Sequence, residues 1–161
     1  MNKKYSSYVA ILIFSISSTV FAKDVCKAKL DKYTISQVGV TTICDWATKI
    51  SDEIQMITPK QLTYSLIVEK STPQNNTITV VSRINYDYAR WKEITAETGS
   101  TPETTQPTLA ITLQQDICSD DNKVYDFRDF IKAGGQVTYE YFFVDSTLLI
   151  TQSVKDCSVV N

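Results

Sequence analysis

Four cysteines carry the most reactive side chains of this 161-residue chain: Cys26, Cys44, Cys118 and Cys157. Thiols can pair as disulfides, bind a metal ion or act as nucleophiles. The spacing contains no C-x-x-C pair, which disfavours a metal site of four thiolates. Four cysteines allow three disulfide connectivities, and their separation into an N-terminal and a C-terminal pair favours Cys26 with Cys44 and Cys118 with Cys157.

The chain has no histidine, and this absence removes most catalytic chemistry. Cysteine–histidine and serine–histidine nucleophiles, imidazole general bases and histidine metal ligands are all excluded. Two carboxylates could still act as acid and nucleophile in glycoside hydrolysis. The candidates are Glu69, Asp87, Glu93 and Glu140. Nothing in their spacing selects a pair, so we predict a protein that is not an enzyme and that has no metal or other cofactor.

The densest group of typical interface residues places three aromatic side chains and one arginine within six residues. These candidate binding residues are Tyr86, Tyr88, Arg90 and Trp91. Tyrosine, tryptophan and arginine are enriched at interface hot spots, which favours a protein-binding or ligand-binding patch. The alternative interpretation is structural, namely a strand end or short helix whose rings cover the edge of a sheet.

Residues 1–22 have the pattern of an export signal. Lys3 and Lys4 precede an uncharged apolar stretch, and Val20-Phe21-Ala22 forms a cleavage site of the A-x-A type. The apolar stretch is short for a membrane span, so we expect cleavage and a mature chain of residues 23–161 without a span. Export places the four cysteines in an oxidising compartment, which predicts two disulfides.

The mature chain is mildly acidic. The leader contains two of the 16 basic residues and no acidic ones, so 14 basic and 18 acidic side chains remain, with a formal charge of −4. Proteins that bind nucleic acid present a basic face to the phosphates, so we expect no nucleic-acid partner. The length of residues 23–161 predicts one domain.

Residues 41–57 show the apolar spacing of three and four that is typical of an amphipathic helix. The apolar stripe consists of Ile43, Trp46, Ala47, Ile50, Ile54 and Ile57. Thr41 or Thr42 can cap the start of this helix, and Pro59 follows its end. Because Trp46 lies on the stripe, we expect it to pack in the core and not to serve as a ligand platform.

Two strands with period-two patterns follow at 61–70 and 77–84, and the turn-forming residues at 71–76 predict a hairpin between them. The apolar residues expected to share one face of the first strand are Leu62, Tyr64, Leu66 and Val68. Farther along the chain, the segment 97–107 is rich in Thr, Glu and Pro, which predicts an exposed mobile loop.

The second half of the chain repeats this order of elements. Helical spacing at Leu109, Leu113 and Ile117 predicts one helical piece, and a second piece at 127–131 ends at Gly134-Gly135. Four polar residues between the two pieces are N-cap candidates: Ser119, Asp120, Asp121 and Asn122. Calcium binding there is disfavoured, because the spacing of an EF-hand loop is absent.

A second hairpin follows, with strands at 136–144 and 147–154. One face of it carries Val137, Tyr139, Tyr141 and Phe143. The opposite face is not purely polar, since it is expected to hold Phe142, Val144 and Leu149. The complete order α-β-β-α-β-β predicts an α+β fold, in which helices cover one face of an antiparallel sheet of about four strands, stabilised by two disulfides.

Several C-terminal motifs carry a resemblance to known proteins. They are Phe127-Arg128-Asp129-Phe130-Ile131-Lys132-Ala133-Gly134-Gly135, Val137-Thr138-Tyr139-Glu140-Tyr141 and Lys155-Asp156-Cys157, together with residues 54–64 around Pro59. This combination of a helical cysteine, a glycine stop, an aromatic strand and a terminal cysteine resembles small exported proteins of Gram-negative bacteria, most of them uncharacterised. The resemblance implies a periplasmic location and supports pairing Cys118 with Cys157. It implies no catalytic residue and does not include Cys26 or Cys44.

We therefore predict a non-catalytic protein-binding domain that is periplasmic or secreted, with another envelope or secreted protein as its partner. The candidate contacts are residues 86–91 and the aromatic face of the second hairpin. An accessory factor of an envelope or secretion assembly would hold a short amphipathic segment of its partner in a groove. An inhibitor or immunity-type protein would instead project a loop, for which 97–107 is the candidate. The alternative to both is a carboxylate-based glycan-binding or glycan-cleaving protein.

Overall fold

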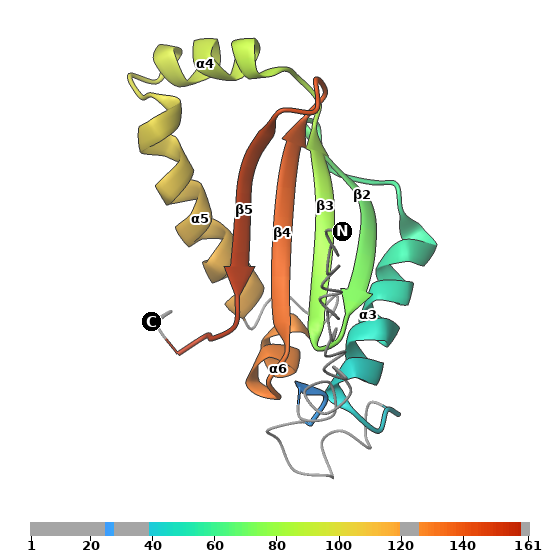
Figure 1. Ribbon diagram of the computed structural model, residues 1–161. Coiled ribbons are helices and arrows are strands. Elements are labelled where there is room, and N and C mark those ends of the chain that lie inside the picture. The colour runs from blue at the N-terminus through green and yellow to red at the C-terminus, as the bar shows by residue number, and fades with distance from the viewer. Residues whose placement is uncertain (1–24, 28–38, 120–125, 159–161) are drawn as a thin grey trace, which may run out of the picture.

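The computed structural model describes residues 25–27, 39–119 and 126–158 (Figure 1). The predicted signal peptide at 1–22 and the N-cap candidates at 120–122 lie outside the described residues. Among the helices that are described, none combines the length and the apolar character needed to cross a bilayer.

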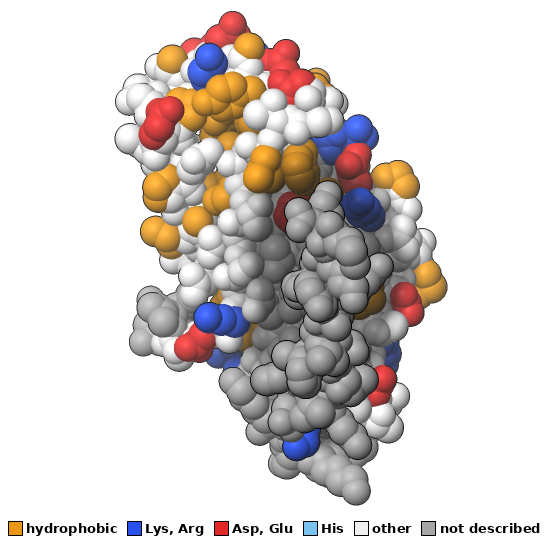
Figure 2. All heavy atoms as spheres, viewed as in Figure 1, with side chains coloured by type: hydrophobic (Ala, Val, Ile, Leu, Met, Phe, Trp, Pro, Cys, Tyr) orange, Lys and Arg blue, Asp and Glu red, His pale blue; other side chains and the backbone are white. Residues whose placement is uncertain are grey.

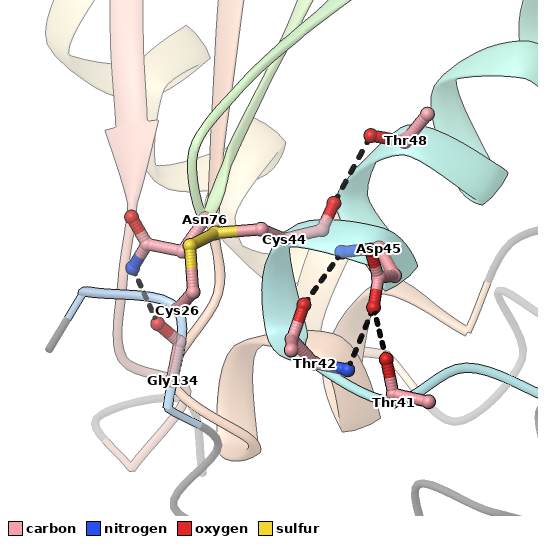
Figure 3. Close-up of a disulfide and its surroundings, with 8 residues drawn as sticks. All are labelled: Cys26, Thr41, Thr42, Cys44, Asp45, Thr48, Asn76 and Gly134. Carbon is pink, nitrogen blue, oxygen red and sulfur yellow. Dashed lines mark hydrogen bonds between the residues drawn. A yellow bond between two sulfur atoms is a disulfide. The ribbon is translucent and has the colours of Figure 1, made fainter. Parts of the chain in front are cut away.

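The first long helix, α3 (Ile43–Ile57), forms where the apolar spacing predicted it. Thr42 is its N-cap and makes a capping box with Asp45 (Figure 3). The Asp45 N–H donates to Thr42 Oγ1 at 3.1 Å, and the Thr42 N–H donates to the Asp45 carboxylate at 3.0 Å. Trp46 is only 3% exposed, so the prediction of a core role for it is confirmed.

In the described part of the chain, five strands form one sheet in the order β1-β2-β3-β4-β5. They are β1 (Lys60–Thr63), β2 (Leu66–Gln74), β3 (Thr77–Ile84), β4 (Gln136–Phe143) and β5 (Leu148–Val154). All neighbours are antiparallel except β3 and β4, which run parallel. A parallel pair needs a long crossover connection, and the helices between β3 and β4 provide it. The predicted α+β fold with two hairpins is confirmed, while β1 and the parallel junction were not predicted.

The prediction of one uninterrupted strand at 61–70 is wrong. The chain turns at residues 64–65 and β1 pairs antiparallel with β2. Leu62 and Tyr64 are consequently 53% and 90% exposed, whereas Val68 is buried. Alternating apolar residues are compatible with one long strand and also with two short strands, because both have a period of two.

The loop predicted at 71–76 is shorter than expected. Strand β2 continues to Gln74, which pairs with Thr77 at the start of β3. Only Asn75 and Asn76 remain for the turn, and Asn75 has a φ of 54°. Asparagine adopts this left-handed conformation more readily than most residues, which makes it a common hairpin residue.

The segment 97–107, predicted as an exposed loop, is mostly helical. Two helices meet here, α4 (Tyr88–Glu97) and α5 (Pro102–Cys118). The Thr101 hydroxyl accepts a hydrogen bond from the Thr104 N–H, and the Thr101 N–H donates to the Thr104 hydroxyl at 3.0 Å. Proline at the first position of a helix has a suitable φ and loses no hydrogen bond. Thr101, Pro102 and Thr104, which indicated a loop, therefore begin a helix, and Pro107 lies within it.

The helices α3, α5 and a short helix α6 (Phe127–Lys132) pack against the sheet (Figure 1). Helix α3 contacts β2 and β3, α5 contacts β5, and α6 contacts β4. Helix α4 lies across the end of the sheet where β3 finishes (Figure 1). The predicted glycine stop is present, since α6 is followed by Gly134 at a φ of 102°.

Two groups of buried side chains form the core. The larger group lies between α3, α6 and the sheet, and the smaller one consists of Ile84, Leu113, Tyr141, Phe143 and Leu149. Leu149 was predicted on the opposite face of the hairpin, but it is 4% exposed and belongs to the core. The register shifts between the pairs Tyr141↔Ile150 and Phe142↔Leu148, which leaves Leu149 as an extra residue. A bulge of this kind changes the direction of a side chain.

The structure contains both predicted disulfides, Cys26–Cys44 and Cys118–Cys157. The first joins the N-terminal segment to the first turn of α3 (Figure 3). The second joins the last residue of α5 to the segment after β5. Each bridge therefore fixes the end of a helix to a chain segment near a terminus.

Candidate protein-binding surface

The candidate binding residues lie where β3 ends and α4 begins. Asp87 is the N-cap of α4, and its carboxylate accepts a hydrogen bond from the Arg90 N–H at 2.8 Å. This cap places Tyr88, Arg90 and Trp91 in the first turn of the helix, while Tyr86 precedes it. The three aromatic candidates are thereby held on a short, well-defined turn.

The rings of Tyr86, Tyr88 and Trp91 gather around Phe143, the last residue of β4. Their centroids lie 6.2, 5.7 and 6.2 Å from that of Phe143, and the Tyr86 and Trp91 rings stack at 6.5 Å. Phe143 is 1% exposed, whereas the three rings around it are half-buried. We call these four residues the aromatic cluster. It joins α4 to the sheet and leaves part of each outer ring accessible.

Arg90 is separated from these ring contacts. Its guanidinium is 2.9 Å from Glu93 and 3.7 Å from Glu97, both on the exposed surface of α4. The hydrogen bond to Glu93 and the charge of Glu97 raise the pKa of Arg90. The structure therefore brings the three aromatic candidates together and places the arginine among the carboxylates of its own helix.

The Trp91 indole shows an unusual feature within the aromatic cluster. Its Nε1–H is buried and has no hydrogen-bond partner within the described part of the chain. Burial without a partner typically costs about 1–3 kcal/mol, so most buried donors are paired. Burial also raises the pKa of Tyr86, which is the ring stacked on Trp91. Part of this cluster is therefore desolvated although it lies close to the surface.

The aromatic face of the second hairpin continues from the cluster along β4. Tyr139 and Tyr141 stack at 6.1 Å, and Tyr139 meets the Phe127 ring edge-on at 6.4 Å. Burial, with a smaller contribution from the Asp116 charge, raises the pKa of Tyr141 to about 12. This row faces the helices, so the predicted face of the hairpin is largely a core face.

Hydrophobic side chains also appear on the surface around this end of the molecule. Figure 2 shows them over the region at the upper left that Figure 1 assigns to α4 and α5. Ile111 on α5 is 59% exposed, and Val144 and Leu148 beside the β4–β5 turn are 48% and 50% exposed. Val144 was expected on the opposite face of the second hairpin, whereas Ile111 and Leu148 were not indicated as surface residues, because single apolar side chains on a surface carry no periodic signal.

The four candidate carboxylates have different roles. Glu69 forms an ion pair with Arg83 at 2.7 Å, Asp87 caps α4, and Glu93 binds Arg90. Glu140 is on β4, paired opposite Thr151 of β5. Three of the four thus have a local structural partner. Among the residues that the structure describes, no cluster of three or more acidic or cysteine side chains is arranged to hold a metal ion.

No protein-family model and no curated protein matches this sequence. Among solved structures, the pilotin EpsS of the Vibrio vulnificus type 2 secretion system has a TM-score of 0.51 at 18% identity, covering 77% of this chain and 93% of that one. The type II secretion system pilotin AspS from Vibrio cholerae has a TM-score of 0.50 at 15% identity, covering 70% and 87%. A Pseudomonas aeruginosa protein provisionally described as secreted has a TM-score of 0.49 at 13% identity, covering 70% and 88%.

At these identities the comparisons show a similar fold. Two of the similar structures belong to secretion systems, which agrees with the resemblance to exported proteins that the C-terminal motifs carry. The disulfides are also typical of proteins outside the cytoplasm.

Proposed function

We propose that this protein is a non-catalytic accessory factor of a secretion assembly in the bacterial envelope, located in the periplasm or secreted. The similarity of its fold to two secretion pilotins is the observation that carries this proposal. The export signal in the sequence and the two disulfides support the location.

The inhibitor or immunity-type alternative depended on a projecting loop at 97–107. Most of that segment belongs to α4 and α5, and only residues 98–101 connect the two helices. The glycan alternative depended on a pair of free carboxylates, and three of the four candidates have structural partners. The structure therefore favours the accessory factor over both alternatives.

The proposed contact surface is the accessible side of the aromatic cluster, with a short amphipathic segment of a partner protein as its ligand. Half-buried tyrosine and tryptophan rings that are already fixed by packing lose little conformational entropy when they bind. Tyr88 and Trp91 meet this description, because both rings are held against Phe143.

The test is affinity purification of the tagged mature protein from the envelope of its own host, with chemical crosslinking and mass spectrometry. Tyr88→Ala should reduce the retained partner at least about tenfold, as expected for an interface hot spot. Tyr88→Phe keeps the ring on Phe143 and should retain the partner within about twofold. Val25→Ala is the control for an exposed apolar residue beside the first disulfide.

Melting curves must accompany each variant, because the rings also pack against Phe143. A folded Tyr88→Ala protein that retains its partner at the wild-type level would refute the aromatic cluster as the contact surface. Recovery of a glycan-processing activity, but of no partner protein, would refute the accessory function.

A further inference from the structure

The two edge strands of the sheet, β5 and β1, differ in what covers them. Helix α5 lies along the β5 edge, and its Gln106 side-chain amide donates to the Leu149 carbonyl at 2.8 Å. The Gln114 amide of the same helix donates to the Asp156 carbonyl, just beyond the strand, at 3.4 Å. A helix that covers an edge in this way prevents another strand from pairing with it.

Among the residues that the structure describes, none covers the opposite edge, β1, in a comparable way. All four β1 residues are exposed, and β2 is the one described strand beside it. An exposed edge strand presents a row of unpaired N–H and C=O groups that another strand can bind.

Exposed apolar side chains lie next to β1 in the sequence. Half of the eight large apolar residues that are exposed in the described part of the chain lie within residues 56–64. They are Met56 at 77%, Ile57 at 44%, Leu62 at 53% and Tyr64 at 90% exposure. Figure 2 shows hydrophobic side chains protruding at the right-hand margin, on the side where Figure 1 places α3. Grouped exposed apolar residues are typical of interaction sites.

The edge also carries a positive charge. Lys60 is exposed at the start of β1 and forms no ion pair with any described residue. A carboxylate on a bound segment would complement this charge, and such complementarity contributes to specificity and to the rate of association.

We propose that the β1 edge binds an extended segment of a partner protein, which adds a sixth strand to the sheet. An extended backbone is the ligand that fits, because a helix uses its own N–H and C=O groups internally. An apolar side chain of the segment contacts Leu62, and an acidic residue faces Lys60. Strands β2 and β3 lie between β1 and β4, whose Phe143 holds the aromatic cluster, although the β1–β2 turn approaches the cluster where the Ser65 carbonyl accepts a hydrogen bond from the Asn85 N–H at 2.9 Å. The inference goes beyond the proposed function by giving the protein a second binding site.

The experiment places a photo-crosslinking amino acid at Gln61 or Leu62 in the full chain, expressed in its own host, with Thr72 of β2 as the control position. Crosslinks from β1 should reach one other protein, at residues spaced two apart within one segment, and the control should not reach that segment. Crosslinks to residues spaced three or four apart would indicate a helix and would overturn the proposal. A product of two copies of this chain, or the absence of any crosslinked protein, would also overturn it.

Substitutions then test the energetics with the partner that crosslinking identifies. Leu62→Lys and Lys60→Glu should each weaken binding at least tenfold, whereas Ile111→Lys, which changes a similarly exposed residue on α5, should stay within about twofold. Equal effects of Leu62→Lys and Ile111→Lys would refute a specific role for the edge. Tyr88→Ala should leave the β1 crosslink unchanged, so failure at one surface is distinguishable from failure at the other.

Discussion

The ring of Phe130 leaves no room for a side chain at Gly135. A Cβ atom built at Gly135 would overlap this ring, and Phe130 is fully buried. Gly135→Ala should therefore lower the free energy of unfolding by about 1–3 kcal/mol, as expected for overpacking. Urea denaturation measures this change.

Gly99→Ala is the matched control for that substitution. Gly99 has a φ of 71°, but open space surrounds the position where its Cβ would lie. Its cost should come from the backbone alone, at about 1–2 kcal/mol. If Gly135→Ala costs as much in a Phe130→Leu background as in the wild type, the steric explanation for Gly135 is wrong.

The capping box of α3 predicts how the stability of the folded protein depends on pH. Hydrogen bonds from Thr41 and then Thr42 lower the pKa of Asp45. Because the folded pKa lies below the unfolded value of about 3.9, these bonds stabilise the protein above that pH. This stabilisation is lost as the pH falls through the folded pKa.

The difference in unfolding free energy between wild type and Asp45→Asn should therefore shrink as the pH is lowered from 6 to 2. Denaturant titrations at several pH values measure it. Asp52→Asn, which removes a carboxylate from the same helix outside the capping box, is the control. A difference that stays constant over this range would contradict the assignment.

At the scale of single elements, the contact between α5 and the β5 edge has a measurable energy. Gln106→Leu removes the hydrogen bond to the Leu149 carbonyl in a partly buried position and should cost about 1–2 kcal/mol. Gln114→Leu, at an exposed bond of 3.4 Å, should cost less than about 0.5 kcal/mol. Thermal unfolding of both variants checks which substitution costs more stability. A larger stability loss for Gln114→Leu would show that α5 is held to this edge mainly near Asp156, not near Leu149.

Periodicity predicted the elements whose apolar residues face one core. Helix α3 and strands β3 and β4 follow this rule, as their buried positions show. The pairing of the cysteines could also be predicted, because each pair is local in the sequence. These features depend on neighbouring residues alone.

The missed features depend on contacts between distant residues or on irregular backbone. The bulge at Leu149 and the turn that separates β1 from β2 break the period of two. The buried hydrogen bond between Ser51 of α3 and Ser71 of β2 joins small polar residues that carry no pattern. Tyr86, Tyr88 and Trp91 were identified from composition, but their common contact, Phe143, is more than fifty residues away and could not be inferred from local sequence.

At the scale of the whole molecule, the two disulfides should differ in their contributions. They close loops with sequence separations of 18 and 39 residues. A bridge stabilises mainly by restricting the unfolded chain, by about 2–4 kcal/mol, and the effect grows with the logarithm of loop length. Replacing Cys118 and Cys157 by Ser should therefore cost about 0.7 kcal/mol more than replacing Cys26 and Cys44.

Denaturation of the two double variants measures this difference, and a non-reducing digest checks the pairing that it assumes. The peptide with Cys26 should be linked to the peptide with Cys44 and not to that with Cys118. A link between the two halves of the chain would contradict both the pairing and the predicted order.

The placement of the bridges also determines how the protein would respond to mechanical force. Tension applied at the two termini passes directly from Cys26 to Cys44 and from Cys118 to Cys157, so the residues inside both loops are shielded. Strands β4 and β5 lie within the second shielded loop. Among the described strands, β1, β2 and β3 lie between Cys44 and Cys118, where neither bridge shields the chain, so the first strand to be pulled from its neighbours would come from this half. A protein anchored at one end and loaded at the other would thus yield in its N-terminal half and keep its C-terminal hairpin folded.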